Sequence, residues 1–192
     1  VRFQETSHLD LTTLLIKRGE LYQNPEKIVD RILDFRGETI GGYSSGLVEF
    51  CTMLHNNDLV GTITFKYAAS SGEVLLPSQR QFIEQTLGCE VYDRYGTEEF
   101  RIIGIECNKH NGFHLNSESF ILEVVDESGK LLAPEQCGKI IVTDLYNRVM
   151  PFIRFDTGDY GKILKEKCPC GLKTIRFIVE GRKLSLSFGL KE

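Results

Sequence analysis

The chain has 192 residues, of which 41% are hydrophobic and 26% are charged, a composition typical of a soluble globular protein with one sizeable core or two small ones. Its net charge of −4 does not favour nucleic acid as a partner, and no apolar run approaches the roughly 20 residues of a membrane helix. The N-terminal residues form neither a signal nor a transit peptide, so we expect a cytoplasmic protein with reduced cysteines.

Helices and strands are predicted to alternate over about residues 1–105. A first helix begins at Asn24-Pro25, because Asn caps free backbone amides and Pro suits the first helical position. A later helix opens at Pro77 and closes at Gly88. The other predicted elements are strands at 38–43, 62–67 and 89–92 and a helix from Ser44 to about Asn57. This alternation indicates a parallel sheet.

Strands dominate the predicted structure of about residues 106–185. They are expected at 120–125, 139–144, 160–164 and 174–179, with a turn cluster at 126–129. Short strands at this spacing predict a small barrel or an open antiparallel sheet. The predicted fold class is therefore α/β, with a parallel-sheet portion followed by a small antiparallel portion that resembles a β-barrel.

Two segments of the first portion carry residue types that suit a ligand. Residues 69–73 and 93–99 each follow a predicted strand, and ligands of parallel sheets lie beyond the carboxyl ends of the strands. Glycine and small residues let the backbone approach a planar or phosphorylated ligand, and the adjacent carboxylates of Glu98 and Glu99 can hold a divalent cation. On spacing alone, ordinary strand-to-helix turns and a solvated acidic pair are the commoner explanations of the same residues.

A third segment, Thr157-Gly158-Asp159, can present a carboxylate to a pair of sugar hydroxyls if it lies at a strand end. By itself it also fits a common β-turn. Gly181-Arg182 carries no signal when it is taken alone.

Together these segments resemble, in order and spacing, the motifs of the adenylate-forming (acyl-activating) superfamily. The matching branch is that of the phenylacetate–CoA ligases and their capsule-biosynthesis relatives. Tyr95-Gly96-Thr97-Glu98-Glu99 is similar to the Tyr-Gly-x-x-Glu motif, and 151–159 is similar to the Thr-Gly-Asp motif with its Pro-x-Ile-Arg setting. Gly181-Arg182 resembles the Gly-Arg before the hinge. Further matches lie at 42–45, 71–73 and 106–114, so the resemblance covers about residues 38–185.

The resemblance implies ATP-dependent activation of a carboxylic acid as an acyl-adenylate (acyl-AMP), with CoA as the acceptor. Glu99 would hold Mg²⁺, which offsets charge as the carboxylate attacks the α-phosphate. Asp159 would accept hydrogen bonds from both ribose hydroxyls, with Arg182 near ribose and phosphate. Tyr43 would border the acyl pocket. The other implied nucleotide-binding residues are Ser71, Gly72, Glu73, Asp93, Arg94 and Tyr95 around adenine, and Gly96 and Thr97 in the adjoining turn, which also borders the acyl pocket.

Some features depart from the family pattern. Glu98 stands where the family often has Ser or Thr, and Ser185 stands at a hinge position that is often acidic. A phosphate loop is missing before residue 40 and a lid domain after residue 185, so we expect a fragment that is inactive alone, with 186–192 beginning the hinge. The alternatives are a non-catalytic nucleotide-binding remnant and a zinc-stapled interaction domain. A homodimer is also compatible with the sequence, whereas nucleic acid and membrane are not expected partners.

A candidate zinc site combines a Cys-x-Cys turn with an upstream Cys and His. Structural zinc needs four nitrogen or sulfur ligands, often supplied as two pairs from separate loops. The candidate ligands are Cys107, His114, Cys168 and Cys170, with His110 as the rival of His114. Buried thiols, a turn and surface histidines would explain the same residues, but some relatives of this branch carry the same set. The other three cysteines, Cys51, Cys89 and Cys137, are expected in the core.

Overall fold

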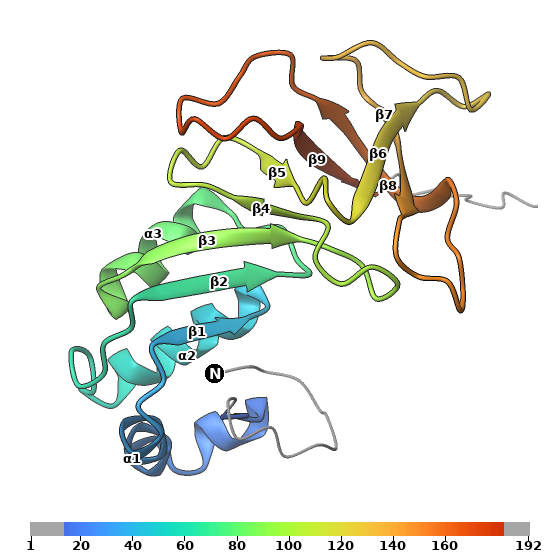
Figure 1. The fold of residues 1–192 in the computed structure, drawn as a ribbon. Coiled ribbons are helices and arrows are strands. Elements are labelled where there is room, and N and C mark those ends of the chain that lie inside the picture. The colour runs from blue at the N-terminus through green and yellow to red at the C-terminus, as the bar shows by residue number, and fades with distance from the viewer. Residues whose placement is uncertain (1–13, 183–192) are drawn as a thin grey trace, which may run out of the picture. The chain divides into compact units, whose positions relative to one another are not determined.

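Figure 1 shows the computed structural model of the chain, which describes residues 14–182. The chain divides between Gly96 and Thr97 into two compact units, each described by itself below. The predicted hinge at 186–192, and Ser185 with it, lie outside the described residues. The predicted domain boundary near residue 105 stays a prediction.

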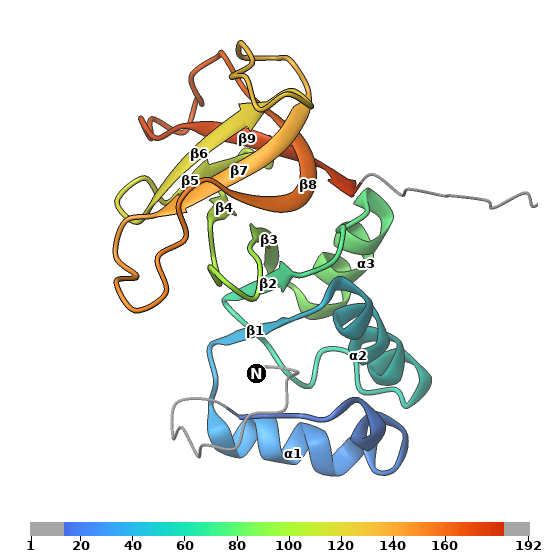
Figure 2. The same cartoon turned by 90° about the vertical axis from the view of Figure 1, so that its right-hand side faces the viewer.

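The first unit is built on a three-stranded parallel sheet in the order β1, β2, β3. Helices α2 and α3 pack together on one face of this sheet (Figures 1 and 2). This arrangement confirms the predicted parallel sheet. The elements are η1 (Arg18–Tyr22), α1 (Pro25–Phe35), β1 (Thr39–Gly42), α2 (Ser44–Asn56), β2 (Tyr67–Ser71), α3 (Pro77–Leu87) and β3 (Glu90–Tyr95).

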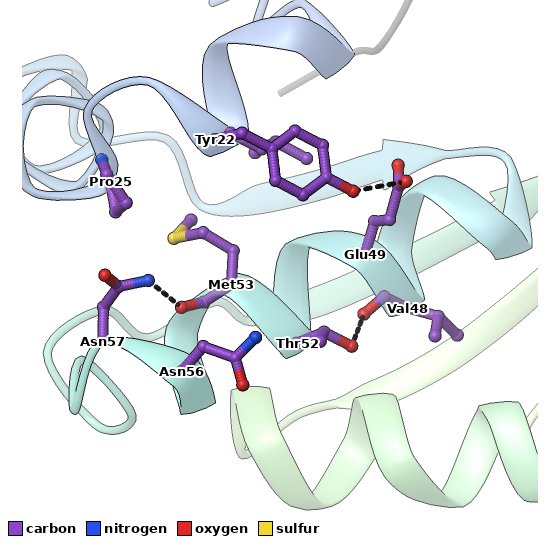
Figure 3. Close-up of a pocket in the computed structure, with 9 residues that line it drawn as sticks. Tyr22, Pro25, Val48, Glu49, Thr52, Met53, Asn56 and Asn57 are labelled. Carbon is purple, nitrogen blue, oxygen red and sulfur yellow. Dashed lines mark hydrogen bonds between the residues drawn. The ribbon is translucent and has the colours of Figure 1, made fainter.

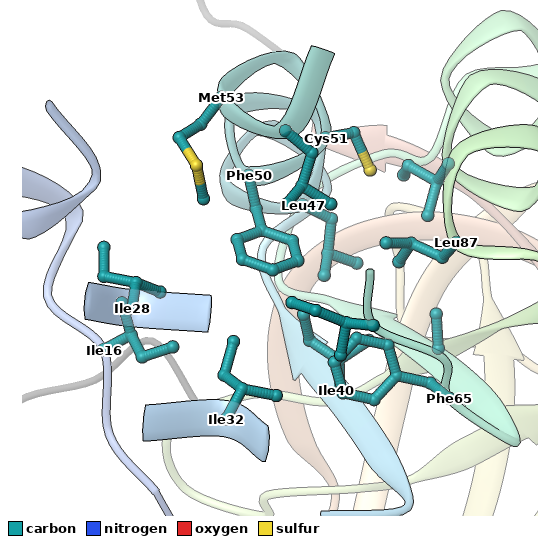
Figure 4. Packing of buried hydrophobic residues seen from close by; sticks show 14 of the residues in the cluster. Ile16, Ile28, Ile32, Ile40, Leu47, Phe50, Cys51, Met53, Phe65 and Leu87 are labelled. Carbon is teal, nitrogen blue, oxygen red and sulfur yellow. The ribbon is translucent and has the colours of Figure 1, made fainter. Parts of the chain in front are cut away.

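The helix ends follow the predicted signals. The Asn24 side chain accepts a hydrogen bond from the Lys27 N–H at 3.1 Å, which satisfies an amide of the first turn of α1. Gly88 ends α3 with φ of +66°, a conformation that costs glycine no side-chain clash. Apolar residues at helical spacing on α1, such as Ile28 and Ile32, then face one buried cluster with Leu47 and Phe50 of α2 (Figure 4).

The strand predicted at 62–67 is wrong. Ile63 and Phe65 are buried in the core cluster, but the segment that carries them has no ladder, and β2 begins only at Tyr67. Alternating apolar residues indicated burial there and not sheet pairing. The actual strand is made largely of small residues, whose β-propensity is weak but which fit between β1 and β3.

The second unit is an antiparallel sheet in the order β4, β5, β9, β8, β7, β6. The sheet is open, which is one of the two predicted forms. It does not close into the barrel that was the other predicted form. Its strands are β4 (Gly104–Glu106), β5 (Phe113–Leu115), β6 (Phe120–Val125), β7 (Gly138–Asp144), β8 (Phe155–Ile163) and β9 (Arg176–Arg182). Cys137, expected in the core, is exposed just before β7. Among residues 14–182, none of the helices has the length and apolar character to cross a membrane.

Gly161 of β8 tests how tightly this sheet is packed. A β-carbon at this position would overlap the carbonyl oxygen of Ile178 on β9 and lie 2.8 Å from Cδ1 of Ile140. We expect Gly161→Ala to lower the free energy of unfolding by about 1–3 kcal/mol, measured by urea denaturation. Gly46→Ala in α2 is the matched control, because its β-carbon would meet nothing within 4 Å and the helix gains propensity. Equal effects of the two substitutions would contradict the prediction.

Candidate functional site

Thr157-Gly158-Asp159 forms a bulge inside β8, so the motif lies neither at a strand end nor in a separate β-turn. Pairing between β7 and β8 shifts register between Lys139 and Ile141, which pair with Tyr160 and Asp156, so the three motif residues oppose Ile140 alone. Gly158 has a positive φ of +75°, which glycine adopts without a side-chain clash, and this conformation permits the bulge.

The bulge is held by the side chains of its own motif. The Thr157 hydroxyl donates to the Ile140 carbonyl at 3.0 Å, and the Asp159 N–H donates to that hydroxyl oxygen at 3.2 Å. The Asp156 carboxylate accepts from the Gly158 N–H at 2.9 Å. The residues of the motif therefore stabilise the bulge themselves. The bulge fixes the backbone at Asp159 and with it the direction in which this side chain leaves the strand.

The structure brings Asp159 and Arg182 together, as the resemblance implied. The two are cross-strand partners on β8 and β9, and Arg182 Nε donates to Asp159 Oδ1 at 3.1 Å. The Asp159 side chain is 11% exposed, whereas that of Arg182 is 73% exposed. A guanidinium beside the carboxylate offsets its charge, so that a phosphorylated ligand can approach with less repulsion.

Glu99 lies in the turn that follows Thr97 and is exposed. The nearby Thr97 side chain, the backbone of Glu99 itself and the positive charge of Arg182 lower the pKa of Glu99 against the opposing effect of desolvation. Its neighbour Phe100 anchors this turn, because the ring makes edge contacts with Phe120, Phe152 and Phe155. An exposed, ionised carboxylate is a suitable ligand for Mg²⁺, which usually needs only one or two protein carboxylates.

The predicted adenine-site residues of the first unit lie partly within strands. β3 runs through Asp93 and Arg94 to Tyr95, which is buried, so these residues do not follow the strand as predicted. Arg94 extends over β1, where a β-carbon at Gly41 would lie 3.4 Å from its Nη2. Their predicted contacts with a nucleotide stay predictions.

Tyr43 and the predicted adenine-site turn meet at the N-terminus of α2. The Tyr43 ring occupies the space where a β-carbon of Gly72 would lie, and Gly72 has φ of +78°. The Glu73 carboxylate accepts hydrogen bonds from Ser45 N–H at 3.0 Å and from Ser44 Oγ at 3.1 Å. Burial alone would raise the pKa of Glu73, but these hydrogen bonds lower it overall. Glu73 thus caps α2 and ties two strand-end loops together, a role that the sequence had not indicated.

A separate cavity of about 270 Å³ lies between η1 and α2 (Figure 3). Within it, the Tyr22 hydroxyl donates to Glu49 at 2.7 Å, and Arg18 also binds this carboxylate. None of the predicted site residues lines this cavity. The lining residues are Leu21, Tyr22, Pro25, Val48, Glu49, Thr52, Met53, Asn56 and Asn57.

The four predicted zinc ligands converge within the second unit, with all ligand atoms within 4.8 Å of one another. Cys107 Sγ lies 3.6 Å from Cys168 Sγ, and Cys170 Sγ lies 3.4 Å from His114 Nε2. Tetrahedral zinc, with bonds of about 2.3 Å to sulfur and about 2.0 Å to nitrogen, would place such pairs roughly 3.6–3.8 Å and 3.5 Å apart. The cluster therefore fits a tetrahedral metal ion.

The geometry favours His114 over its rival His110. His114 is in β5 and 8% exposed, and its Nε2 faces the sulfurs. His110 instead lies 3.2 Å from the Glu106 carboxylate, four residues earlier, and is not one of the four clustered side chains.

Cys168 is expected to be a thiolate at neutral pH even without metal. A backbone hydrogen bond from Cys170 is the main cause that lowers its pKa to about 6, helped by His114 and the neighbouring cysteines. Since the pKa is lowered on folding, this thiolate stabilises the fold above its unfolded-state pKa, and the stabilisation is lost as pH falls through about 6. Ultraviolet absorbance of thiolate in the metal-free chain should show a step near pH 6.

The step should disappear in Cys168→Ser. It should persist in the control Cys51→Ser, because burial raises the pKa of Cys51 to about 12. A step near pH 6 that survives in Cys168→Ser would assign the titration to another group.

Comparison with known proteins identifies curated relatives, although no protein-family model matches. The chain is 29% identical to a phenylacetate–coenzyme A ligase of Thermus thermophilus over 158 residues, which is 79% of this chain and 35% of that protein. It is 26% identical to a phenylacetate–coenzyme A ligase of Pseudomonas putida over 72% of this chain and 33% of that protein. The chain thus spans about a third of the length of these curated relatives.

Solved structures share the fold of this chain. A 2-hydroxyisobutyryl-CoA ligase in complex with 2-HIB-AMP and CoA matches with a TM-score of 0.72 and 22% identity, over 81% of this chain and 38% of that chain. An ATP-bound RpMatB-BxBclM chimera matches with a TM-score of 0.61 and 20% identity, over 88% of this chain and 34% of that chain. At these identities the likeness establishes the fold.

Proposed function

We propose that the chain, whose curated relatives include phenylacetate–CoA ligases, is part of an ATP-dependent ligase of the adenylate-forming superfamily. The ligase would activate a carboxylic acid as an acyl-adenylate and pass the acyl group to CoA. The observation that carries the proposal is the ion pair between Asp159, on the bulge of β8, and Arg182 of β9. The charge of Arg182 also helps to lower the pKa of Glu99.

In this proposal the second unit binds the sugar and phosphate of ATP. Asp159 accepts hydrogen bonds from the ribose hydroxyls, because the bulge fixes the direction of its carboxylate. Arg182, held at its Nε by Asp159, keeps an exposed guanidinium for phosphate oxygens. Glu99 would hold Mg²⁺, and the ion would supply positive charge where pyrophosphate leaves.

The first unit, together with Thr97 at the start of the second, would supply the adenine and acyl contacts. Ser71, Gly72, Asp93, Arg94, Tyr95, Gly96 and Thr97 remain the proposed nucleotide-binding residues, and Tyr43 the proposed edge of the acyl pocket. Glu73 would act through its cap on α2, since its carboxylate is already engaged by Ser44 and Ser45.

Zinc in the cluster of Cys107, His114, Cys168 and Cys170 would have a structural role. All four positions are taken by protein ligands, which leaves no open site for a reacting group. The ion would join the segment after β4 to the loop between β8 and β9, two segments more than 50 residues apart in the chain.

The activity is tested by the exchange of radioactive pyrophosphate into ATP. The assay uses the longer protein that contains this chain and a panel of aryl, aliphatic and amino acids as substrates. Exchange that depends on one of these acids, followed by thioester formation with CoA, is the expected result. Nucleotide binding without any exchange would favour the non-catalytic remnant instead. Absence of nucleotide binding by the longer protein would favour the zinc-stapled interaction domain. A cytoplasmic location and a homodimer remain predictions.

A further inference from the structure

Arg176 is a buried cation whose contacts are backbone carbonyls. The residue is 5% exposed, on β9. Its Nη1 donates to the Asn111 carbonyl at 2.9 Å, and its Nη2 donates to the Glu166 carbonyl at 3.0 Å. Within residues 14–182 it forms no ion pair with a carboxylate. Burying a charge in this way costs free energy unless hydrogen bonds or a nearby opposite charge compensate for the lost hydration.

The two carbonyls belong to the two segments that carry the metal ligands. Asn111 lies between Cys107 and His114, and Glu166 lies two residues before Cys168. Arg176 is also the cross-strand partner of His114 in the pairing of β5 with β9. The Arg176 guanidinium therefore hydrogen-bonds to both ligand segments, and Arg176 itself is paired across the strands with the ligand His114.

The Thr174 hydroxyl contacts the imidazole of His114 on the nitrogen that faces away from the sulfurs. Thr174 Oγ1 lies 3.1 Å from His114 Nδ1, while His114 Nε2 faces Cys170 Sγ at 3.4 Å. If Nδ1 carries the hydrogen and donates it to Thr174, Nε2 keeps its lone pair for a metal ion. Such outer contacts fix the tautomer and the ring orientation of metal-binding histidines.

We propose that Arg176 and Thr174 are positioning residues of the metal site, which set the spacing of the ligand loops and the orientation of His114. This inference rests on the zinc site proposed above. A zinc ion bound by three thiolates and a neutral imidazole has a net charge of −1, and the buried guanidinium offsets it. Ligand segments that are held in place beforehand also lose less conformational entropy when the ion binds.

The test for Arg176 is zinc affinity of the 192-residue chain, measured by competition with a chromophoric chelator. We expect Arg176→Lys to weaken zinc binding at least about tenfold, because an ammonium group keeps the charge but cannot span both carbonyls as the planar guanidinium does. The matched control is Arg154→Lys in the same unit, whose guanidinium binds Glu123 and the Gly129 carbonyl, away from the ligand segments. The control should keep wild-type affinity.

Two further measurements separate positioning from a general loss of fold. The thermal midpoint of the metal-free chain shows whether Arg176→Lys still folds, and the visible spectrum of the Co²⁺-substituted protein reports tetrahedral geometry. We expect a weaker tetrahedral spectrum in Arg176→Lys. A wild-type spectrum together with wild-type zinc affinity in this variant would overturn the role of Arg176.

Thr174 supplies a pair of variants that preserve the fold, because the residue is exposed. Thr174→Val should weaken zinc binding by roughly tenfold, and Thr174→Ser, which retains the hydroxyl, should restore it. Unchanged zinc affinity in both Arg176→Lys and Thr174→Val would overturn this inference while the zinc site stands. A wild-type chain that binds no zinc would overturn the proposed metal site, and this inference with it.

Discussion

Removal of zinc by a chelator, or replacement of Cys170 by Ser, is expected to lower the thermal unfolding midpoint of the second unit by on the order of 15 °C or more. The reason is linkage, since an ion that binds only the folded state stabilises it by about 4 kcal/mol when its free concentration is 1,000 times the dissociation constant. The ligand atoms already lie within 4.8 Å of one another, so binding requires little rearrangement of the loops.

Scanning calorimetry with and without chelator measures this shift, and metal analysis gives the zinc content of the same samples. Cys137→Ser is the matched control, because Cys137 is an exposed cysteine of the same unit outside the cluster. It should keep one zinc per chain and the wild-type midpoint. A wild-type zinc content far below one per chain, or a midpoint that chelation leaves unchanged, would contradict a structural zinc site.

Asp159→Ala and Glu99→Gln are each expected to depress acid-dependent ATP–pyrophosphate exchange at least about tenfold in the longer protein, near 1.4 kcal/mol of lost stabilisation. Asp159→Ala removes the proposed ribose acceptor and also releases Arg182 from its hydrogen bond. Glu99→Gln removes the negative charge proposed to hold Mg²⁺, so its defect should lessen as the Mg²⁺ concentration is raised.

Glu98→Gln is the matched control for the second substitution. Glu98 is the exposed neighbour of Glu99 in the same turn, and its removal should leave exchange unchanged or raise it, since a carboxylate there repels phosphate. Equal losses in Glu98→Gln and Glu99→Gln would indicate a general electrostatic effect. Unchanged exchange in Asp159→Ala and Glu99→Gln would remove both residues from the proposed site.

The sequence was most informative where a structural signal is local. Asn24 and Pro77 marked helix starts and Gly88 a helix end, because capping depends on residues within one turn. The ordered motifs also indicated the phenylacetate–CoA ligase branch, and two curated relatives that the chain matches are phenylacetate–CoA ligases. The strand predicted at 62–67 was wrong because the buried Ile63 and Phe65 give the same alternation of apolar and polar residues as a strand.

The composition of the candidate site could be predicted, but its geometry could not. The sequence by itself determined the four metal-ligand candidates and the acidic and basic residues assigned to ATP. Only the tertiary structure decided that His114 and not His110 joins the cluster, that Asp159 lies on a bulge opposite Arg182, and that Glu73 caps a helix. It also revealed Arg176, which no motif marks. The physical reason is that strand register and loop closure bring together residues separated by tens of positions, and no local pattern encodes those distances.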